Sequence, residues 1–417
     1  MKHEIDIQRE FSCDVCVVGG GTAGVFAAIS AARIGARVVL IEKNPRLGGT
    51  VTAGGVNYPG LFFAWGKQII GGPCFESIER TIALGGARMP KISYRPAHHW
   101  LEQILLDKLT YTKVLNDMCR EAGVTVWTNA MIAAATEGDG GLALLITDKA
   151  GLLSLKAKTA VDSTGDATLI TLLGYPTERS EIQQPATPDN HLSGYEYSDI
   201  DLADLEAKWA ASPFILRTPM EKIKNYLEIH KINFHVPSVK AETPEGRALV
   251  EETAVEDLFA YVRELRRVRG LENLVMDRLA DETGVRETVR IVGEHRITVE
   301  EYQSGKDFED AICYAFYPVD LHVAKGIEIT QLADNVLPKI PYRALIPKGA
   351  DRVLAAGRCL ASDTYANSAL RVQAPCMAMG QAAGVAAALS AKSGESVRSL
   401  AVSDIQNGLS SIGTIVP

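Results

Sequence analysis

A glycine-rich turn between a buried strand and a helix constrains the fold of this chain more than any other feature. Residues 13–43 read CDVCVVGGGTAGVFAAISAARIGARVVLIEK, which indicates a strand, a glycine turn, a helix that ends near Gly35, and a second strand. This order predicts a βαβ unit that opens a parallel sheet. The alanines of the predicted helix allow close packing against that sheet, so we predict an α/β fold.

The spacing of three glycines in this turn indicates a dinucleotide site. Gly19, Gly21 and Gly24 form the pattern GxGxxG. The first permits the turn, the second admits a pyrophosphate, and the third brings the helix onto the strand. Glu42 ends the second strand, where a carboxylate accepts hydrogen bonds from ribose hydroxyls. We therefore predict a Rossmann-like domain whose cofactor contacts in this region are Gly19, Gly21, Thr22, Ala23, Gly24, Glu42 and Lys43.

Three further turns favour FAD over NAD. The residues GGT at 48–50 follow Glu42, and a domain that binds only a nicotinamide cofactor does not need a long glycine loop there. The turns DSTGD at 162–166 and AGR at 356–358 both follow β-like runs, so both can approach one long cofactor at the carboxyl ends of the strands. The predicted contacts of these turns are Gly49, Thr50, Thr164, Gly165, Asp166, Gly357 and Arg358. An NAD-dependent dehydrogenase without flavin is the alternative.

The rest of the chain divides the expected cofactor domain into two segments. We predict helices near 75–84 and 98–122, a strand at 124–130, and an antiparallel β-meander between 131 and 161. From 175 to 325 the sequence is polar and helix-rich, without a second βαβ pattern. A strand at 352–358 and an Ala/Gly-rich helix after Pro375 return to the first pattern. We therefore expect an FAD-binding domain at 1–174 and 326–417, and a mixed, helix-rich cap or substrate domain at 175–325.

Composition narrows the partners and the compartment. The formal net charge of -8 leaves no basic surplus for a nucleic-acid backbone. No stretch approaches the roughly 20 apolar residues of a membrane span, and the N-terminal MKHEIDIQRE lacks the apolar core of a signal peptide. The 7 cysteines are scattered, as in reduced intracellular proteins. No metal-ligand spacing occurs. We expect a cytoplasmic protein without nucleic acid, membrane span or metal.

Several sequence blocks carry a family likeness. They are the N-terminal glycine motif, the STGD turn, YPVDLHV at 317–323, IPYRALIPKGADRVLAAGRC at 340–359 and LRVQAPCMAMGQAAGVAAAL at 370–389. In these blocks the chain resembles the GR2-type FAD-dependent oxidoreductases, a family beside the fumarate reductase and succinate dehydrogenase flavoproteins. The resemblance implies FAD as the cofactor, which we expect to be non-covalently bound. It also implies that the last helix directs its N-terminus, near Ala374 and Met377, at the pyrimidine edge of the flavin, where its dipole stabilises the charge of reduction.

A few polar residues are candidates for catalysis. Asp320 and His322 lie two apart, so in an extended segment they share one face. We predict that His322 acts as an acid or base toward the substrate, or as a hydrogen-bond donor to the flavin; a structural histidine is the alternative. By the resemblance Arg371 lies near the flavin, where it neutralises reduced flavin or a substrate carboxylate unless it forms an ordinary ion pair. Further candidates are Tyr342, Arg343, Arg286, Arg290, His98 and His99.

The predicted activity is hydride exchange between FAD and a small organic substrate. The single GxGxxG motif indicates no resident NAD(P)H domain, so we expect an external electron acceptor or donor. The alternatives are a non-catalytic flavin-binding scaffold and an electron-transfer subunit of a larger reductase complex. The cysteine-rich iron–sulfur segments of such subunits are absent from this sequence. A homo-oligomer is compatible with the sequence.

Overall fold

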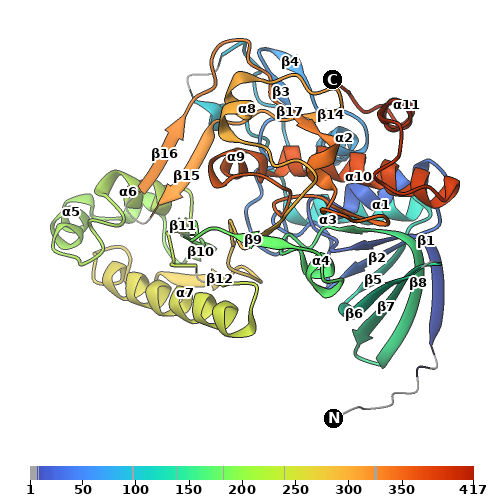
Figure 1. The fold of residues 1–417 in the computed structure, drawn as a ribbon. Coiled ribbons are helices and arrows are strands. Elements are labelled where there is room, and N and C mark those ends of the chain that lie inside the picture. Colours follow the sequence, from blue (N-terminus) through green and yellow to red (C-terminus); the bar gives the residue numbers. More distant parts are fainter. Residues whose placement is uncertain are drawn as a thin grey trace.

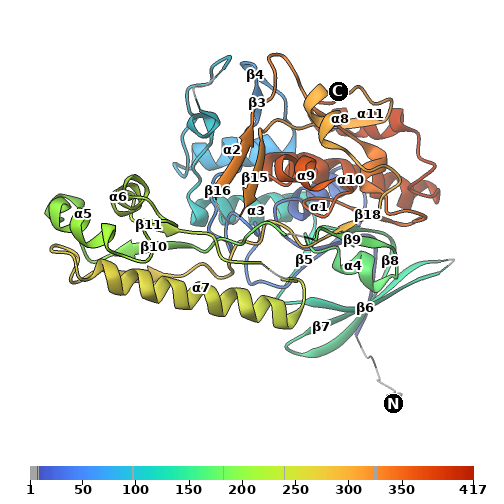
Figure 2. The same cartoon turned by 60° about the vertical axis from the view of Figure 1, so that its left-hand side comes forward.

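The computed structural model describes residues 7, 9–95, 98–138, 140–181, 183–238, 240–323 and 326–417. Figure 1 shows a twisted sheet with a layer of helices on one face and, beside them, a lobe that contains α5 (Leu202–Ala210), α6 (Met220–Glu228) and α7 (Pro244–Leu265). Figure 2 shows α7 as a long helix along the outer side of the lobe.

A seven-stranded sheet forms the centre of the fold. Its strand order is β5-β2-β1-β8-β7-β6, and β18 pairs with the carboxyl end of β8. The pairs that join β5, β2, β1, β8 and β18 are parallel, whereas β7 is antiparallel to both β8 and β6. The strands are β1 (Glu10–Val18), β2 (Val38–Glu42), β5 (Thr125–Thr128), β6 (Met131–Gly138), β7 (Gly141–Asp148), β8 (Gly151–Asp162) and β18 (Val353–Ala355). The predicted parallel sheet with an antiparallel meander is confirmed.

Two helices from opposite ends of the chain pack closely on this sheet. They are α1 (Gly24–Arg33) and α10 (Gln373–Ser393). A Cβ atom on Gly380 would lie 2.1 Å from the carbonyl oxygen of Ala23, and one on Gly384 would lie 2.1 Å from that of Ala27. The helices therefore reach this separation only because α10 carries glycine at both positions. The helices α2 (Pro73–Ala83) and α3 (Lys108–Ala122) continue the layer beside α1.

The apolar helix α10 belongs to the core. Among the described residues it is the one helix long and apolar enough to cross a membrane by length and composition. However, 94% of its apolar window is buried inside the protein. The hydroxyl of Thr159 on β8 donates to the carbonyl of Ala387, which ties α10 to the sheet at 2.9 Å. The composition of α10 is thus that of a helix packed on all sides by protein.

The lobe has a hydrophobic core of its own between Leu192 and Leu274, with Trp209 and Tyr261 fully buried in it. A three-stranded sheet lines it, with the strands β10 (Asp189–Ser193), β11 (Lys231–Asn233) and β12 (Val275–Arg278) in the order β11-β10-β12. Farther along the chain, Ile297 and Ile312 pack instead with the core around α1 and α10. The predicted domain boundaries at 174/175 and 325/326 stay predictions.

A hairpin lies between the lobe and the helix layer (Figure 1). It consists of β15 (Val319–Val323) and β16 (Gly326–Thr330), and β15 packs against α9 (Thr364–Leu370). The remaining elements are β3 (Phe63–Ala64), β4 (Lys67–Gln68), η1 (His99–Glu102), α4 (Thr168–Leu172), β9 (Thr177–Arg179), η2 (Tyr197–Asp199), β13 (Val289–Ile291), α8 (Val299–Ser304), β14 (Ala311–Tyr314), β17 (Lys339–Pro341), η3 (Tyr342–Leu345) and α11 (Val402–Ser411).

The predicted helix at 98–122 is wrong in its first part. Only a short 3₁₀ helix, η1, forms there, and the chain then runs extended to Asp107, which caps α3 by accepting the N–H of Thr110. Glu102, Ile104 and Leu106 are buried, and the residues between them are more exposed. This burial period of two is that of an extended segment, and it overrides the helical propensity of the leucines.

Candidate functional site

The glycine turn after β1 leaves no room for side chains at two of its positions. A Cβ on Gly19, whose φ is +100°, would lie 2.5 Å from the carbonyl oxygen of Ser163. A Cβ on Gly24 would lie 1.7 Å from the carbonyl oxygen of Gly19. Beside Gly21, in contrast, the nearest atom to an added Cβ is the Cα of Gly49 at 3.7 Å. The turn is tight where strand and helix meet and open at the glycine predicted to face a pyrophosphate.

Two hydroxyl groups in this region lack partners. The Oγ1 of Thr22 and the Oγ of Ser163 are buried, and neither forms a hydrogen bond within the described protein. A buried hydroxyl without a partner carries a free-energy cost that a polar ligand removes. The open glycine turn and these hydroxyls fit the diphosphate of a dinucleotide such as FAD.

Glu42 is buried at the end of β2, with 5% of its surface exposed. Its carboxylate accepts the N–H of Gly20 at 2.6 Å and the N–H of Asn44 at 2.7 Å. Burial raises the pKa of Glu42, and these two hydrogen bonds oppose that rise. The carboxylate therefore also holds the glycine turn. The neighbouring Lys43 forms an ion pair with Glu282, so its charge is already compensated within the protein.

The glycine doublet after β2 lies against the glycine turn. The N–H of Gly48 donates to the carbonyl of Gly20 at 2.9 Å, and a Cβ on Gly49 would lie 2.7 Å from the Cα of Gly21. The carbonyl of Thr50 accepts the N–H of Val56 at 3.0 Å. The loop that contains the predicted contacts Gly49 and Thr50 is thus fixed directly beside the predicted diphosphate position.

The structure also brings together the two other predicted turns, at 162–166 and 356–358. Asp162 is fully buried and accepts the N–H and the hydroxyl of Thr164 at 3.0 and 2.7 Å. Across from this turn, Arg358 donates from Nε to the carbonyl of Gly165 at 2.7 Å and forms an ion pair with Asp166. Gly357 has a φ of +106°. The guanidinium of Arg358 thus bonds to Gly165, Asp166 and Val285, and Asp166 also accepts the hydroxyl of Thr288.

The N-terminus of α10 is bound to the loop that follows the glycine doublet. The N–H of Ala374 donates to the carbonyl of Pro59 at 2.7 Å, and the amide of Gln373 donates to that of Val56 at 2.8 Å. Met377 is completely buried. The amide of Ala374 is therefore already satisfied by protein, and its predicted role beside the flavin stays a prediction, as does that of Met377.

A polar cluster lies at β15, next to α9. His322 places Nδ1 at 2.9 Å from Nε2 of His235, and Nε2 at 3.3 Å from a carboxylate oxygen of Asp320. Burial, with the charges of Arg286 and Arg371, lowers the pKa of His322 to about 4. Burial alone would raise the pKa of Asp320, but the hydrogen bond from His322 and the two arginines lower it overall. At neutral pH a neutral imidazole therefore donates from Nε2 to an ionised carboxylate.

Arg371, at the end of α9, joins this cluster. The Nη2 of Arg371 donates to the amide oxygen of Gln184 at 3.0 Å and to the backbone carbonyl of Asp320 at 3.4 Å. Its Nε is buried and has no partner among the described residues. Arg286 lies beside it and donates from Nη1 to the carbonyl of Pro185 at 2.7 Å and the hydroxyl of Thr187 at 2.6 Å.

The third side of the cluster is aromatic. The hydroxyl of Tyr317 lies 3.1 Å from Nε2 of His99 and 3.4 Å from the amide nitrogen of Gln103. Burial and the charge of Asp320 raise the pKa of Tyr317. The Nδ1 of His99 is buried without a partner. His98 does not join the cluster, because it is exposed and stacks on Trp100.

Tyr342 and Arg343 have other partners. Tyr342 is 2% exposed, and its hydroxyl donates to the carbonyl of Val397 at 2.8 Å, near the C-terminal end of the chain. Arg343 forms an ion pair with Asp310 at 3.0 Å. The structure therefore does not bring the predicted catalytic residue Tyr342 to His322 and Arg371, since its hydroxyl fastens η3 to the C-terminal segment.

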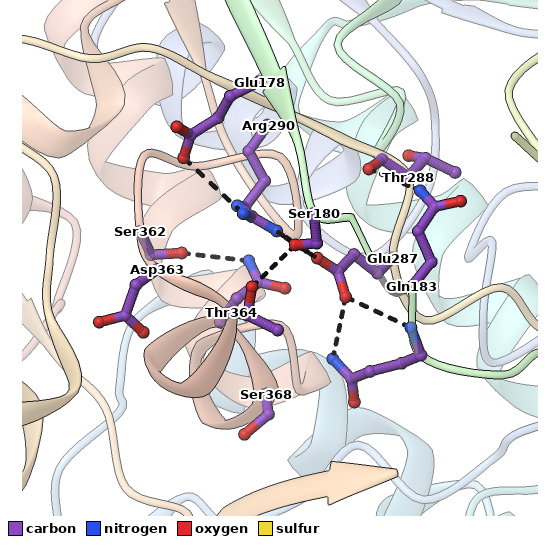
Figure 3. Close-up of polar contacts among 12 residues, drawn as sticks. Glu178, Ser180, Gln183, Glu287, Thr288, Arg290, Ser362, Asp363, Thr364 and Ser368 are labelled. Carbon is purple, nitrogen blue, oxygen red and sulfur yellow. Dashed lines mark hydrogen bonds and ion pairs between the residues drawn. The ribbon is translucent and has the colours of Figure 1, made fainter. Parts of the chain in front are cut away.

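A second buried network lies next to this cluster (Figure 3). Glu287 forms a buried ion pair with Arg290 and accepts the hydroxyl of Ser180, which also lies 2.7 Å from that of Thr364. The other carboxylate oxygen of Glu287 faces the backbone and side-chain amides of Gln184 at 3.4 and 3.5 Å. Glu287 thus connects the ion pair to the glutamine that holds Arg371.

Several members of the polar cluster were not selected from the sequence. Tyr317 is the first residue of the YPVDLHV block but does not share the alternation of Asp320 and His322. His235 lies far from that block in the sequence, and Gln184 belongs to no motif. Arg286 and Arg290 have a helical spacing that suits a solvated face, but they lie in extended chain before and within β13, and Arg290 is 2% exposed. No shared sequence pattern connects Tyr317, His235 and Gln184, because they lie on three separate segments of the chain.

Comparison with known proteins gives a family-level match. A family model described as FAD dependent oxidoreductase matches residues 14–409. The 4-oxocyclohex-2-ene-1-carboxylate 5-dehydrogenase of Sinomonas cyclohexanicum is 42% identical over 62 residues, which cover 14% of this chain and 10% of that protein. The fumarate reductase (cytochrome) of Shewanella frigidimarina is 59% identical over 46 residues, which cover 11% of this chain and 8% of that protein. The chain thus matches about a tenth of the length of these relatives.

Among solved structures, a geranylgeranyl bacteriochlorophyll reductase-like protein of Thermoplasma acidophilum has a TM-score of 0.49 at 14% sequence identity. That match covers 97% of this chain and 83% of the other. Within the described residues, no group of His, Cys, Asp and Glu side chains has an arrangement that could hold a metal ion.

Proposed function

Because this chain belongs to the FAD dependent oxidoreductase family, it is an enzyme that uses FAD, and we propose that it exchanges a hydride between non-covalently bound FAD and a small organic substrate. An oxidoreductase of this kind needs a small-molecule substrate and an electron acceptor or donor. The bound flavin ring supplies the hydride chemistry, and the protein supplies binding, orientation and charge.

The glycine turn and its neighbours are the residues that would hold FAD. The open side of Gly21 would admit the diphosphate, and the unpartnered hydroxyls of Thr22 and Ser163 would donate to it or to the ribitol chain. Glu42 would accept the ribose hydroxyls of the adenosine half. The loop at 48–50 lies beside these residues, so it would cover the same ligand.

The cluster around His322 would bind the substrate and move a proton. Neutral His322 directs Nε2–H at Asp320, so its Nδ1 can take a proton when the substrate displaces the contact with His235. The ionised carboxylate of Asp320 would stabilise the imidazolium that forms. Arg371 and Tyr317 would orient polar groups of the substrate, each from a different element.

One observation carries this proposal. Arg371 closes α9 two residues before α10 begins, and the first residues of α10 hold the loop that continues from the glycine doublet. The polar cluster and the predicted FAD contacts are therefore joined through a short stretch of rigid backbone. A substrate on the cluster would lie next to the cofactor end of that loop.

Anaerobic reduction of the holoenzyme by a panel of hydroxy acids, sugars, amines and steroids tests the proposal. We expect at least one substrate to bleach the yellow flavin, and deuterium at its transferred position to slow the bleaching. Acid precipitation should release FAD from the protein. Flavin that is reduced only by single-electron donors, or reduced without any isotope effect, would contradict hydride transfer.

A further inference from the structure

The polar cluster holds more positive than negative charge. Its cations are Arg286, Arg371 and Lys222. The charge of Arg371 lowers the pKa of Arg286, and the charge of Arg286 lowers the pKa of Lys222, so the three cations lie near one another. Among the described residues, Asp320 is the one carboxylate that faces the two arginines without a cationic partner of its own, since Glu287 is paired with Arg290. His322 is neutral at pH 7. The two arginines and Asp320 together therefore carry one excess positive charge, and Lys222 adds a second.

The two arginines are bound only to neutral groups. Within the described residues, neither forms an ion pair: Arg371 donates to an amide oxygen and a backbone carbonyl, and Arg286 to a backbone carbonyl and a hydroxyl. Burial, and next the like charge of Arg371, lower the pKa of Arg286 to about 9. The two arginines are partly buried and share the single carboxylate of Asp320. An excess of positive charge in such a place is costly, which indicates that an anion completes the site.

Free donors are present for such an anion. The Nε of Arg371 is buried without a partner, and the Nδ1 of His99 on the aromatic side is also unpartnered. Gln184, 2% exposed, holds Nη2 of Arg371 from one side and is itself held by Glu287, so the guanidinium plane is fixed. A planar, fixed guanidinium matches the two oxygens of a carboxylate.

We propose that Arg286 and Arg371 bind a carboxylate group of the substrate, so that the substrate is a small organic acid. This inference rests on the proposed function, because it assigns the substrate class of the same site. Counted against Asp320, the two arginines leave one excess positive charge, which suits a monoanionic head group better than a doubly charged phosphate. Lys222 reaches the cluster from α6, so the lobe would contribute to recognition of a larger acid.

Calorimetric titration of the FAD-loaded enzyme with benzoate, malonate, benzamide, malonamide and inorganic phosphate tests this subsite. We expect both carboxylates to bind and both amides to bind at least tenfold more weakly. The variants Arg371→Met and Arg286→Met should each weaken carboxylate binding about 10- to 100-fold, as expected for hydrogen bonds to a charged group. The control Arg120→Met, which removes an exposed arginine of α3, should leave binding unchanged.

Three results would overturn the proposal. The first is equal binding of a carboxylate and its amide, the second is unchanged carboxylate affinity in both methionine variants, and the third is tighter binding of phosphate than of either carboxylate. Where a methionine variant fails to fold or to retain FAD, carboxylate binding is measured in Arg371→Lys and Arg286→Lys instead. Lysine keeps the charge but not the planar fork, so a loss of at least about fivefold is expected, and unchanged affinity in both contradicts the subsite.

The subsite and hydride transfer can fail separately. Flavin reduction by neutral substrates alone would overturn the carboxylate subsite and leave hydride transfer intact. Carboxylate binding that depends on both arginines, in an enzyme whose flavin no substrate reduces, would leave the subsite intact and overturn hydride transfer.

Discussion

The contact between α1 and α10 predicts that Gly380→Ala weakens FAD binding. The added methyl would lie 2.1 Å from the carbonyl oxygen of Ala23, which is backbone and cannot rotate away. Ala23 lies in the glycine turn directly before α1. The segment at Gly357 is also close to it, since a Cβ on Gly357 would lie 3.4 Å from the Cβ of Ala23. The methyl therefore pushes the turn rather than a flexible side chain.

The size of the effect follows from two opposing terms. Alanine in a helix interior gains about 1 kcal/mol over glycine. An overpacked core costs roughly 1–3 kcal/mol, and a clash with backbone belongs at the upper end. We expect a net loss of about 2 kcal/mol in the free energy of unfolding of the apoprotein, and FAD binding weaker by about tenfold, which corresponds to about 1.4 kcal/mol.

Flavin fluorescence quenching during reconstitution of the apoprotein measures the FAD affinity, and urea unfolding followed by circular dichroism measures the stability. Gly408→Ala in α11 is the matched control, because its added methyl meets side-chain atoms that can move, Cγ1 of Val385 at 2.7 Å and Cδ1 of Leu389 at 4.0 Å. If Gly380→Ala and Gly408→Ala bind FAD equally well and unfold at the same urea concentration, the reasoning about the close helix contact is wrong.

Four further changes separate cofactor, catalytic and structural roles. Ser163→Ala should lower FAD affinity several-fold, as for one hydrogen bond, without moving the urea midpoint of the apoprotein, because its hydroxyl lacks a protein partner; unchanged affinity would remove it from the site. Tyr342→Phe should leave turnover unchanged and cost about 1 kcal/mol of stability; lost turnover would contradict this. Because the pKa of His322 is lowered to about 4, the folded protein binds fewer protons than the unfolded chain. The free energy of unfolding should therefore fall as the pH drops from about 6.5 to 4. His322→Gln should reduce that fall when urea unfolding is measured at several pH values. Arg290→Met should cost about 3–5 kcal/mol in urea unfolding, since it leaves Glu287 buried and unpaired; a loss below about 1 kcal/mol would refute that role.

The sequence predicted the cofactor half of the molecule because its signals are local. The glycine spacing, the strands on either side and Glu42 all lie within one βαβ unit, whose geometry depends on neighbours in the chain. The turns at 162–166 and 356–358 were also expected to approach one ligand, and they meet through Arg358 and Gly165. Strand ends of a parallel sheet share one edge, so this long-range contact follows from the local pattern.

The polar cluster could not be predicted in the same way. Its members come from η1, the segment before β10, the lobe, and the chain on either side of β15, so no single periodicity relates them. Tyr317 precedes Pro318 and the start of β15, so the two-residue alternation that pairs Asp320 with His322 does not reach it. Tyr342 shows the reverse case: it lies in a family-like block, yet its hydroxyl is used by the distant Val397.

The contrast between Arg290 and Arg371 shows how the fold separates structure from function. Arg290 pairs with Glu287, which also contacts Gln184, and Gln184 in turn holds Arg371. Arg290 is 2% exposed, and Arg371 is partly buried. Arg290 is closed into an ion pair, so the protein alone satisfies its charge. Arg371 donates only to neutral oxygens, shares the carboxylate of Asp320 with Arg286 and keeps a buried N–H free, so a bound anion would complete the compensation of its charge. A protein that needed Arg371 for stability alone would be more stable with an apolar side chain there, because a partly buried cation in a region of excess positive charge costs free energy. An anionic ligand that binds to Arg371 would recover this free energy. Arg371, rather than the paired Arg290, therefore indicates where the substrate binds.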